Sequence, residues 1–201
     1  DDGALTNALT LNGGTLRGTN GFGQYWDGNI TLGAHSTIKA ANNFYIDGVI
    51  SGSSKNLTKT GTGTVILRGT NTYSGTTTVS AGTLNIGGSG SLGSGTYAGN
   101  ISNSGTFTYA SSTAQTLSGV ISGSGALTKS GSSTLTLSGT NTYSGDTTIS
   151  AGAIAVSGLL GNGTYAGAIA NSGTLTLSSS SAQTLSGVIS GSGGITKSGS
   201  G

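Results

Sequence analysis

Internal repetition is the feature that most constrains what this chain can fold into. The twelve residues AQTLSGVISGSG stand at 114–125 and return unchanged at 182–193, an offset of 68 positions. A longer echo at an offset of 70 links LTKTGTGTVILRGTNTYSGTTTVSAGTLNI at 57–86 to LTKSGSSTLTLSGTNTYSGDTTISAGAIAV at 127–156. Self-similarity at a nearly fixed period indicates units that bury their apolar surface by stacking on one another.

The composition is that of an ordered but nearly uncharged chain. Among 201 residues there are 40 Gly, no Pro and no Cys, only 6% are charged, and the formal net charge is +2. Disorder favours high net charge and few β-branched residues, whereas Val, Ile and Thr recur here in regular alternation. The basic residues are too dilute for a nucleic-acid footprint. No apolar run reaches the roughly 20 residues that span a bilayer. We therefore expect neither nucleic-acid binding nor a transmembrane segment in this chain.

Short segments of alternating apolar and small polar residues predict the strands. Alternation of period two, bounded by Gly and Ser, is the pattern of a half-buried strand. The clearest segments are 64–67, 83–86, 106–109, 134–137, 153–156 and 174–177, with further strands expected at 76–80, 116–122, 147–150 and 184–190. No segment sustains a period of 3.6, so we expect almost no helix.

The spacing of these strands predicts an all-β solenoid. The central residues Val65, Leu84, Phe107 and Leu135 follow one another at intervals of 19, 23 and 28, each about the length of one coil. We expect these residues in one column, with about three coils per 68–70-residue repeat and eight or nine coils in total. Gly supplies the sharp corners, and the absence of Pro leaves every N–H free to bond a neighbouring coil. The predicted core rungs are Val65, Leu67, Leu84, Ile86, Phe107, Leu135, Leu137, Ile154, Val156, Leu175 and Leu177.

The repeats also predict the domain organisation. We expect one elongated domain over 1–201, made of a diverged copy at 1–56, a copy at 57–126 and a copy at 127–201 that is incomplete at its end. Gly48–Gly52 in the diverged part echoes Gly119–Gly123. Because the last copy stops part-way through its pattern, we expect either a slice of a longer protein or a unit that stacks on copies of itself.

The succession of short motifs in the repeat resembles that of a known family. The succession LTKTGTG at 57–63, GTNTYSG at 69–75, TTTV at 76–79 and AGTL at 81–84 is similar to the autotransporter-associated β-strand repeat, found in passenger domains of bacterial autotransporters and in large related surface proteins. It occurs in full at 57–86 and 127–156 and begins again at 195–199. The resemblance implies a right-handed parallel β-helix, export through the outer membrane and display at the bacterial cell surface.

Lysines and tyrosines recur with the repeat. Lys59, Lys129 and Lys197 share one repeat position, and we expect solvated corner residues that deter edge pairing. A basic stripe for anionic glycans is the alternative. The repeated tyrosines are Tyr73, Tyr143, Tyr97 and Tyr165. For these we expect packed corners or a ladder with the hydroxyl at the surface, with sugar-stacking platforms as the alternative.

Departures from the repeat gather before residue 50, where a specific site is most expected. Asp27 and Asp47 are 20 residues apart, about one coil, and are the best carboxylate pair for acid–base chemistry. With Tyr25 and Trp26 they form the candidate contact surface for a glycan or a protein partner. The lone His35 lacks companions for a metal site, so a hydrogen-bonded surface role is expected. We assign no catalytic, cofactor or metal residues.

The function expected from the sequence is structural. The leading hypothesis is a non-enzymatic stalk segment of a secreted or surface-displayed bacterial protein, supporting display, adhesion or self-association. A subunit of an extracellular filament, stacking end to end through open β-helix edges, is the first alternative. A glycan-binding or glycan-cleaving β-helix is the second. The expected partners are copies of the chain, neighbouring coils, cell-surface glycans or the surfaces of host or neighbouring cells.

Overall fold

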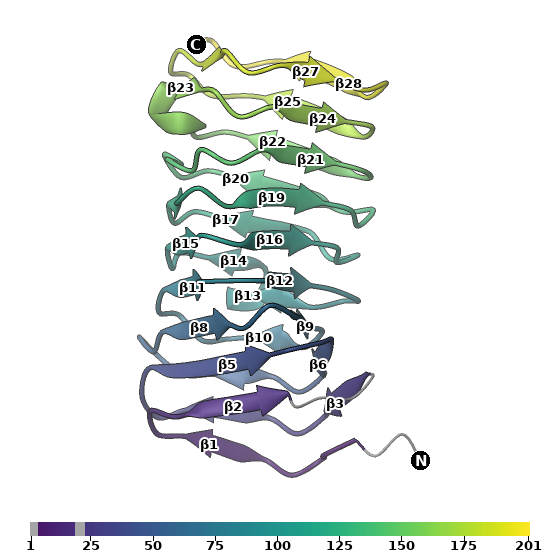
Figure 1. The fold of residues 1–201 in the computed structure, drawn as a ribbon. Coiled ribbons are helices and arrows are strands. Elements are labelled where there is room, and N and C mark those ends of the chain that lie inside the picture. Colours follow the sequence, from purple (N-terminus) through teal and green to yellow (C-terminus); the bar gives the residue numbers. More distant parts are fainter. Residues whose placement is uncertain (1–3, 19–22) are drawn as a thin grey trace.

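A computed structural model, which describes residues 4–18 and 23–201, is an all-β solenoid of stacked coils (Figure 1). Every strand pairs in parallel with a strand one coil away, and the longest sheet contains nine strands, one from each coil. In Figure 1 the near strands run from left to right while the chain climbs from its N-terminal to its C-terminal end, so the solenoid is right-handed. The predicted fold class is confirmed.

Each coil has three faces, which we number in chain order starting from the strand Thr15–Gly18. Face 1 is a six-stranded sheet of β2 (Thr15–Gly18), β5 (Ser36–Ala40), β8 (Leu57–Thr60), β11 (Thr77–Val79), β15 (Ile101–Asn103) and β18 (Ile121–Ser122). Face 2 is the nine-stranded sheet of β3 (Gln24–Trp26), β6 (Phe44–Ile46), β9 (Thr64–Leu67), β12 (Thr83–Ile86), β16 (Thr106–Tyr109), β19 (Ala126–Lys129), β21 (Thr147–Ile149), β24 (Ile169–Asn171) and β27 (Ile189–Ser190).

Face 3 is assembled from shorter sheets. It starts with β1 (Leu9–Leu11), β4 (Ile30–Leu32) and β7 (Ile50–Ser51), followed by the pair β10 (Thr70–Asn71) and β13 (Ser91–Leu92). It continues as the six-stranded sheet of β14 (Thr96–Tyr97), β17 (Gln115–Leu117), β20 (Thr134–Leu137), β22 (Ala153–Val156), β25 (Thr174–Leu177) and β28 (Gly194–Lys197). The strands β23 (Thr164–Tyr165) and β26 (Thr184–Leu185) form a separate pair that lies at the face 1 position of the upper coils, because each follows a face 3 strand and precedes a face 2 strand. The helical elements of the described residues are two 3-10 turns, η1 (Gly93–Gly95) and η2 (Gly161–Gly163).

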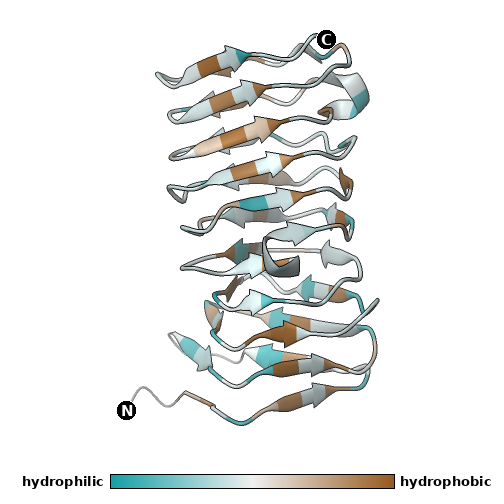
Figure 2. Cartoon of the chain, turned by 180° about the vertical axis from the view of Figure 1, so that it is seen from behind, coloured by the Kyte–Doolittle hydropathy of each residue, from teal (hydrophilic) through white to brown (hydrophobic). Residues whose placement is uncertain are grey.

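The interior is a set of columns in which each side chain lies on its counterpart one coil below. On face 2, Val65, Leu84, Phe107 and Leu127 follow one another in register, and all four are buried. Figure 2 shows hydrophobic residues recurring at matching places on successive strands. Ten of the eleven predicted rung residues are buried, and Leu177 is partly buried. These columns together form one continuous hydrophobic core rather than a set of separate clusters.

The repeat contains more than three coils, which corrects part of the predicted stacking. The residue above Phe107 is Leu127, whereas Leu135 pairs with Gln115 on face 3, so the expected step from Phe107 to Leu135 was wrong. Strand β8 lies on face 1 but its copy β19 lies on face 2, and β9 on face 2 has its copy β20 on face 3. Each repeat therefore spans three coils plus one face, and successive copies are rotated by about a third of a turn.

A second correction concerns the predicted strand 116–122 and its copy 184–190. Each is two strands joined by a corner: β17 and β18 flank Gly119, and β26 and β27 flank Gly187. A Cβ on Gly119 would lie 2.3 Å from the carbonyl oxygen of Gly99 in the preceding coil. The chain can bend here, close to the backbone of the coil below, because glycine has no Cβ. The alternating pattern of apolar residues does not reveal this constraint.

Glycines line the corner between faces 1 and 2 in a vertical ladder. A Cβ on Gly105, Gly125 or Gly145 would lie 2.3–2.4 Å from the carbonyl oxygen of the ladder glycine one coil below. Contacts this short do not occur for real Cβ atoms, so these corners require glycine for close approach of the coils. The high glycine content is thus a requirement of coil stacking rather than a sign of flexibility.

Candidate functional site

The repeated lysines lie inside the solenoid, not at solvated corners. Lys59 is only 1% exposed and lies in the interior column between Ile38 below and Val79 above. Its Nζ donates hydrogen bonds to the carbonyl oxygens of Thr60 at 3.1 Å, Gly61 at 2.8 Å and Ala81 at 2.9 Å. Burial lowers the pKa of Lys59 to about 8, so the ammonium form still predominates at neutral pH. The expected solvated lysine is therefore wrong for Lys59.

Lys129 repeats this arrangement one face further round. It is fully buried between Tyr109 and Ile149, its Nζ donates to the carbonyl of Gly131, and it lies 5.9 Å from the centroid of the Tyr109 ring. Burial also lowers its pKa. Lys197 makes the same bond to Gly199 but is exposed on the last described coil. In the two complete copies the lysine position is thus a buried donor to corner carbonyls, and in the last coil the same donor is exposed.

The repeated tyrosines form buried hydrogen-bonded triplets. Thr77 Oγ1 lies 2.8 Å from the hydroxyl of Tyr73 and 2.7 Å from that of Tyr97, and the Tyr97 hydroxyl donates onward to the carbonyl of Gly75. The second copy, Tyr143–Thr147–Tyr165, has the same contacts. The packing of these rings agrees with the expectation, but the hydroxyl groups lie in the interior and not at the surface. These tyrosines offer no platform to a sugar.

Replacing the central threonine should destabilise the triplet measurably. Thr77→Val keeps the shape of the side chain but removes the atom that both phenol groups bond, and a buried polar group left without a partner costs about 1–3 kcal/mol. We expect the free energy of unfolding to fall by about 2 kcal/mol, measured by chemical denaturation. Thr78→Val, on the outward side of the same strand, is the matched control and should change it by less than about 0.5 kcal/mol. Equal effects would contradict the network.

The same burial predicts a single alkaline transition. It raises the pKa of Tyr97 from 10 to about 12, and raises the pKa values of Tyr73 and Tyr143 well above their ordinary range. The unfolded chain loses these protons near pH 10 while the fold retains them. The stabilisation is therefore complete below pH 10 and is lost as the pH rises through about 12. We expect the tyrosinate absorbance of the buried tyrosines to appear together with the loss of β-sheet circular dichroism. Ionisation of all the tyrosines with intact circular dichroism would contradict this.

The residues that depart from the repeat form an aromatic and charged cluster on the first coils of face 2. Tyr25 and Tyr45 face outward in register, with ring centroids 4.7 Å apart and an interplanar angle of 9°. The guanidinium carbon of Arg68 lies 5.3 Å from the Tyr25 centroid and 4.9 Å from the Tyr45 centroid. Both rings are half-buried. The two stacked rings and the guanidinium group of Arg68 therefore form one partly exposed cluster.

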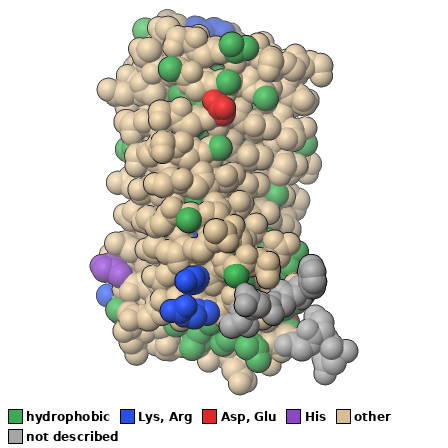
Figure 3. Space-filling view, viewed as in Figure 1, with side chains coloured by type: hydrophobic (Ala, Val, Ile, Leu, Met, Phe, Trp, Pro, Cys, Tyr) green, Lys and Arg blue, Asp and Glu red, His purple; other side chains and the backbone are tan. Residues whose placement is uncertain are grey.

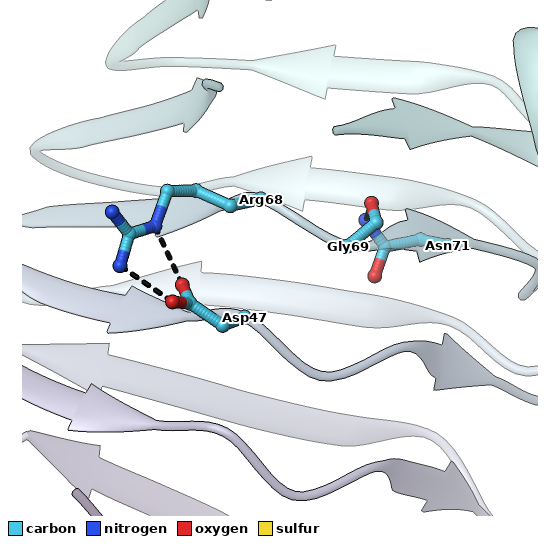
Figure 4. A network of polar contacts seen from close by, with 4 residues as sticks. All are labelled: Asp47, Arg68, Gly69 and Asn71. Carbon is cyan, nitrogen blue, oxygen red and sulfur yellow. Dashed lines mark hydrogen bonds and ion pairs between the residues drawn. The ribbon is translucent and has the colours of Figure 1, made fainter. Parts of the chain in front are cut away.

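The carboxylates lie at the corner beside this stack. Asp27 and Asp47 follow the paired residues Trp26 and Ile46, which places them on adjacent coils. Both oxygens of Asp47 are engaged by Arg68, at 2.5 Å from Nε and 2.6 Å from Nη2 (Figure 4). An exposed bidentate pair of this kind contributes at most about 1 kcal/mol. Within the predicted carboxylate pair, Asp47 is therefore held by Arg68 rather than free beside Asp27.

Trp26 and His35 have separate environments. Trp26 is partly buried against the core, and its Nε1 has no hydrogen-bond partner among the described residues. His35 is exposed on a different side, where its Nδ1 accepts a hydrogen bond from the backbone N–H of Asn56 at 3.0 Å. The four predicted contact residues Tyr25, Trp26, Asp27 and Asp47 thus lie on two adjacent coils, while His35 is apart from them. In the described part of the chain, no three His, Cys, Asp or Glu residues gather as a metal site.

Arg68 is the member of this cluster that the sequence analysis passed over. It contacts both rings and Asp47, yet it lies inside a strong repeat copy, whereas the predicted site residues are departures from the repeat before residue 50. A comparison of the two copies predicts Arg68 as a special position, because the second copy has Ser138 at the corresponding place. Within an internal repeat, one charged residue against one small residue marks a local function or contact.

The comparisons with known proteins agree with the repeat. Residues 57–86 and 127–156 match the family model described as the passenger-associated-transport-repeat, as the resemblance predicted. The chain therefore carries two copies of this repeat, which, together with the β-solenoid fold, fit an autotransporter passenger-like segment. Searches of curated proteins and of solved structures gave no match. In the described residues, no helix is long and apolar enough to cross a membrane.

Proposed function

We propose that this chain is a rigid, non-enzymatic stalk segment of an exported bacterial protein, displayed at the cell surface or secreted. The matched passenger-associated repeats support export and surface location, because that is where proteins of this kind act. The absence of cysteine suits a chain that crosses membranes unfolded, since no premature disulfide can form. The role of the segment is to hold apart, or to present, what lies at its two ends.

The observation that carries this proposal is the unbroken vertical pairing of the coils. The face 2 sheet runs through all nine coils, and the buried side chains of Asn71 and Asn141 on the other faces bond both upward and downward. Asn71, for example, accepts from the N–H of Ile50 in the coil below and donates to the carbonyl of Ser91 in the coil above. Such ties resist bending as well as separation, which is the property a stalk needs.

A distance measurement tests the stalk. The segment is fused between donor and acceptor fluorescent domains, and single-molecule energy transfer reports their separation. Strands about 4.8 Å apart make nine coils a rod of roughly 40 Å. Duplicating residues 57–126 should add about 16 Å while keeping one narrow population, since the repeat adds just over three coils. A broad distribution of distances, or no change on duplication, would show that the segment is not a rigid spacer.

End-to-end self-association is a second candidate, favoured by the apolar side chains at the last coil. Val188, Ile189 and Ile195 are 73%, 39% and 51% exposed there. A further coil of the same polypeptide or a second copy of the chain would cover them. Sedimentation velocity over a wide concentration range separates the two. Assemblies that grow with concentration and are abolished by Ile195→Asp would support contact with a second copy of the chain. A chain that stays monomeric at every concentration would exclude end-to-end self-association.

A further inference from the structure

The distribution of positive charge in the folded chain differs from that in the sequence. Of the seven Lys and Arg residues, Lys59 and Lys129 are inside, Arg68 is paired with Asp47, and Lys197 lies at the far end. The remaining three, Arg17, Lys39 and Lys55, lie on or beside the first three strands of face 1. We call the outward surface of β2, β5 and β8 the basic face.

Two of these cations stand directly opposite each other. Arg17 and Lys39 are register partners on β2 and β5, both are exposed, and Thr60 continues their column on β8. Like charges directly opposite each other on a sheet destabilise it. In the described residues the ion pair is that of Arg68 and Asp47, so neither Arg17 nor Lys39 has a carboxylate beside it. An anion bound between them would relieve this repulsion.

The rest of the basic face is made of hydroxyl groups. Thr15, Thr37 and Thr58 form the neighbouring outward column, in register from coil to coil. Exposed His35 and half-buried Lys55 lie at the edge where the chain enters this face. Figure 3 shows Lys and Arg side chains grouped over the lower coils, the His at the edge beside them and the acidic side chain well above. The surface is therefore flat, positive and rich in hydrogen-bonding groups.

The chemistry of this surface distinguishes among anionic partners. A membrane would require exposed apolar side chains, but the large ones in the described residues are Leu5, Val188, Ile189 and Ile195, all outside this face. Nucleic acid requires more phosphate contacts than two or three cations provide. A polysaccharide with spaced carboxylate, sulfate or phosphate groups fits both features, because its hydroxyls match the threonine column. We propose that the basic face binds an anionic polysaccharide, with Arg17 and Lys39 holding the acidic groups.

Binding of defined polymers to the folded chain tests this proposal independently of the stalk function. The probes are polygalacturonate and dextran sulfate, with neutral dextran as the uncharged polymer, at low and at near-physiological salt. We expect both polyanions to bind, dextran not to bind, and affinity to fall with salt. The double variant Arg17→Gln/Lys39→Gln should weaken binding by about tenfold or more and flatten the salt dependence. Lys197→Gln, which removes one exposed charge at the other end, should leave binding unchanged.

Several results would overturn the proposal. These are unchanged binding in the double variant, an equal loss in Lys197→Gln, or equal binding of neutral dextran. Tighter binding to phosphatidylglycerol vesicles or to duplex DNA than to either polyanion would assign the face to a membrane or to nucleic acid. Because the side chains of Arg17 and Lys39 point to solvent, we expect the double variant to fold like the parent chain. Circular dichroism of each variant checks this.

Discussion

Gly125→Ala is expected to destabilise the solenoid by about 3 kcal/mol or more, which is at the upper end of the cost of overpacking. The added methyl would lie 2.3 Å from the carbonyl oxygen of Gly105 and 2.7 Å from the side chain of buried Asn103. The first of these is backbone, which cannot move aside without separating two coils. The free energy of unfolding from chemical denaturation, followed by circular dichroism, measures the effect.

The matched control is Gly194→Ala in strand β28, where a Cβ would meet no atom within 4 Å. Alanine restricts the unfolded chain more than glycine does, so this variant should be neutral or stabilised by up to about 1 kcal/mol. A neutral Gly125→Ala would show that the coils separate easily at their corners. The close-packed ladder would then not be the reason for the glycine content.

Lys59→Met is expected to cost about 3 kcal/mol, because three corner carbonyls lose their donor and each such loss costs about 1 kcal/mol or more. Methionine keeps the apolar stem in the column between Ile38 and Val79, so the change tests the ammonium group rather than packing. Denaturation at pH 7, where the ammonium form predominates, gives the measurement.

Lys39→Met supplies the comparison for this prediction. Lys39 points outward on the adjacent strand β5, and the same substitution there should change stability by less than about 0.5 kcal/mol. A Lys59→Met variant as stable as the parent would mean that the cost of burying the ammonium group cancels its three hydrogen bonds. Buried charges elsewhere can behave in that way.

The sequence predicted the fold class and the main strands because both depend on local alternation and on repetition. Strands β9, β12, β16, β20, β22 and β25 have the predicted bounds. It failed where the answer depends on which coil lies underneath. Leu127 and Leu135 are both central residues of alternating strands, and no local pattern says which of them stacks on Phe107. The choice depends on where the corners fall, which is set by close contacts between coils.

The repeated lysines were misplaced for a related reason. Lys59 lies in an alternating strand at an inward position, but a charged residue suggests solvent, since burying an unpaired charge is costly. The carbonyls that compensate this cost come from Gly61, two residues away, and from Ala81 in the next coil. A donor whose partners come from two coils cannot be recognised from one strand. Arg68, in contrast, could have been found by comparing the two copies.

The extra face in each repeat has a consequence for any longer array of such units. Were the repeat a whole number of coils, identical surface residues in successive copies would line up along one side of the rod. Because β8 on face 1 becomes β19 on face 2, each added copy presents the same residues in a new direction. Lengthening by duplication would therefore place the same surface residues at successive positions around the circumference of the rod. A long array would present these residues in every direction.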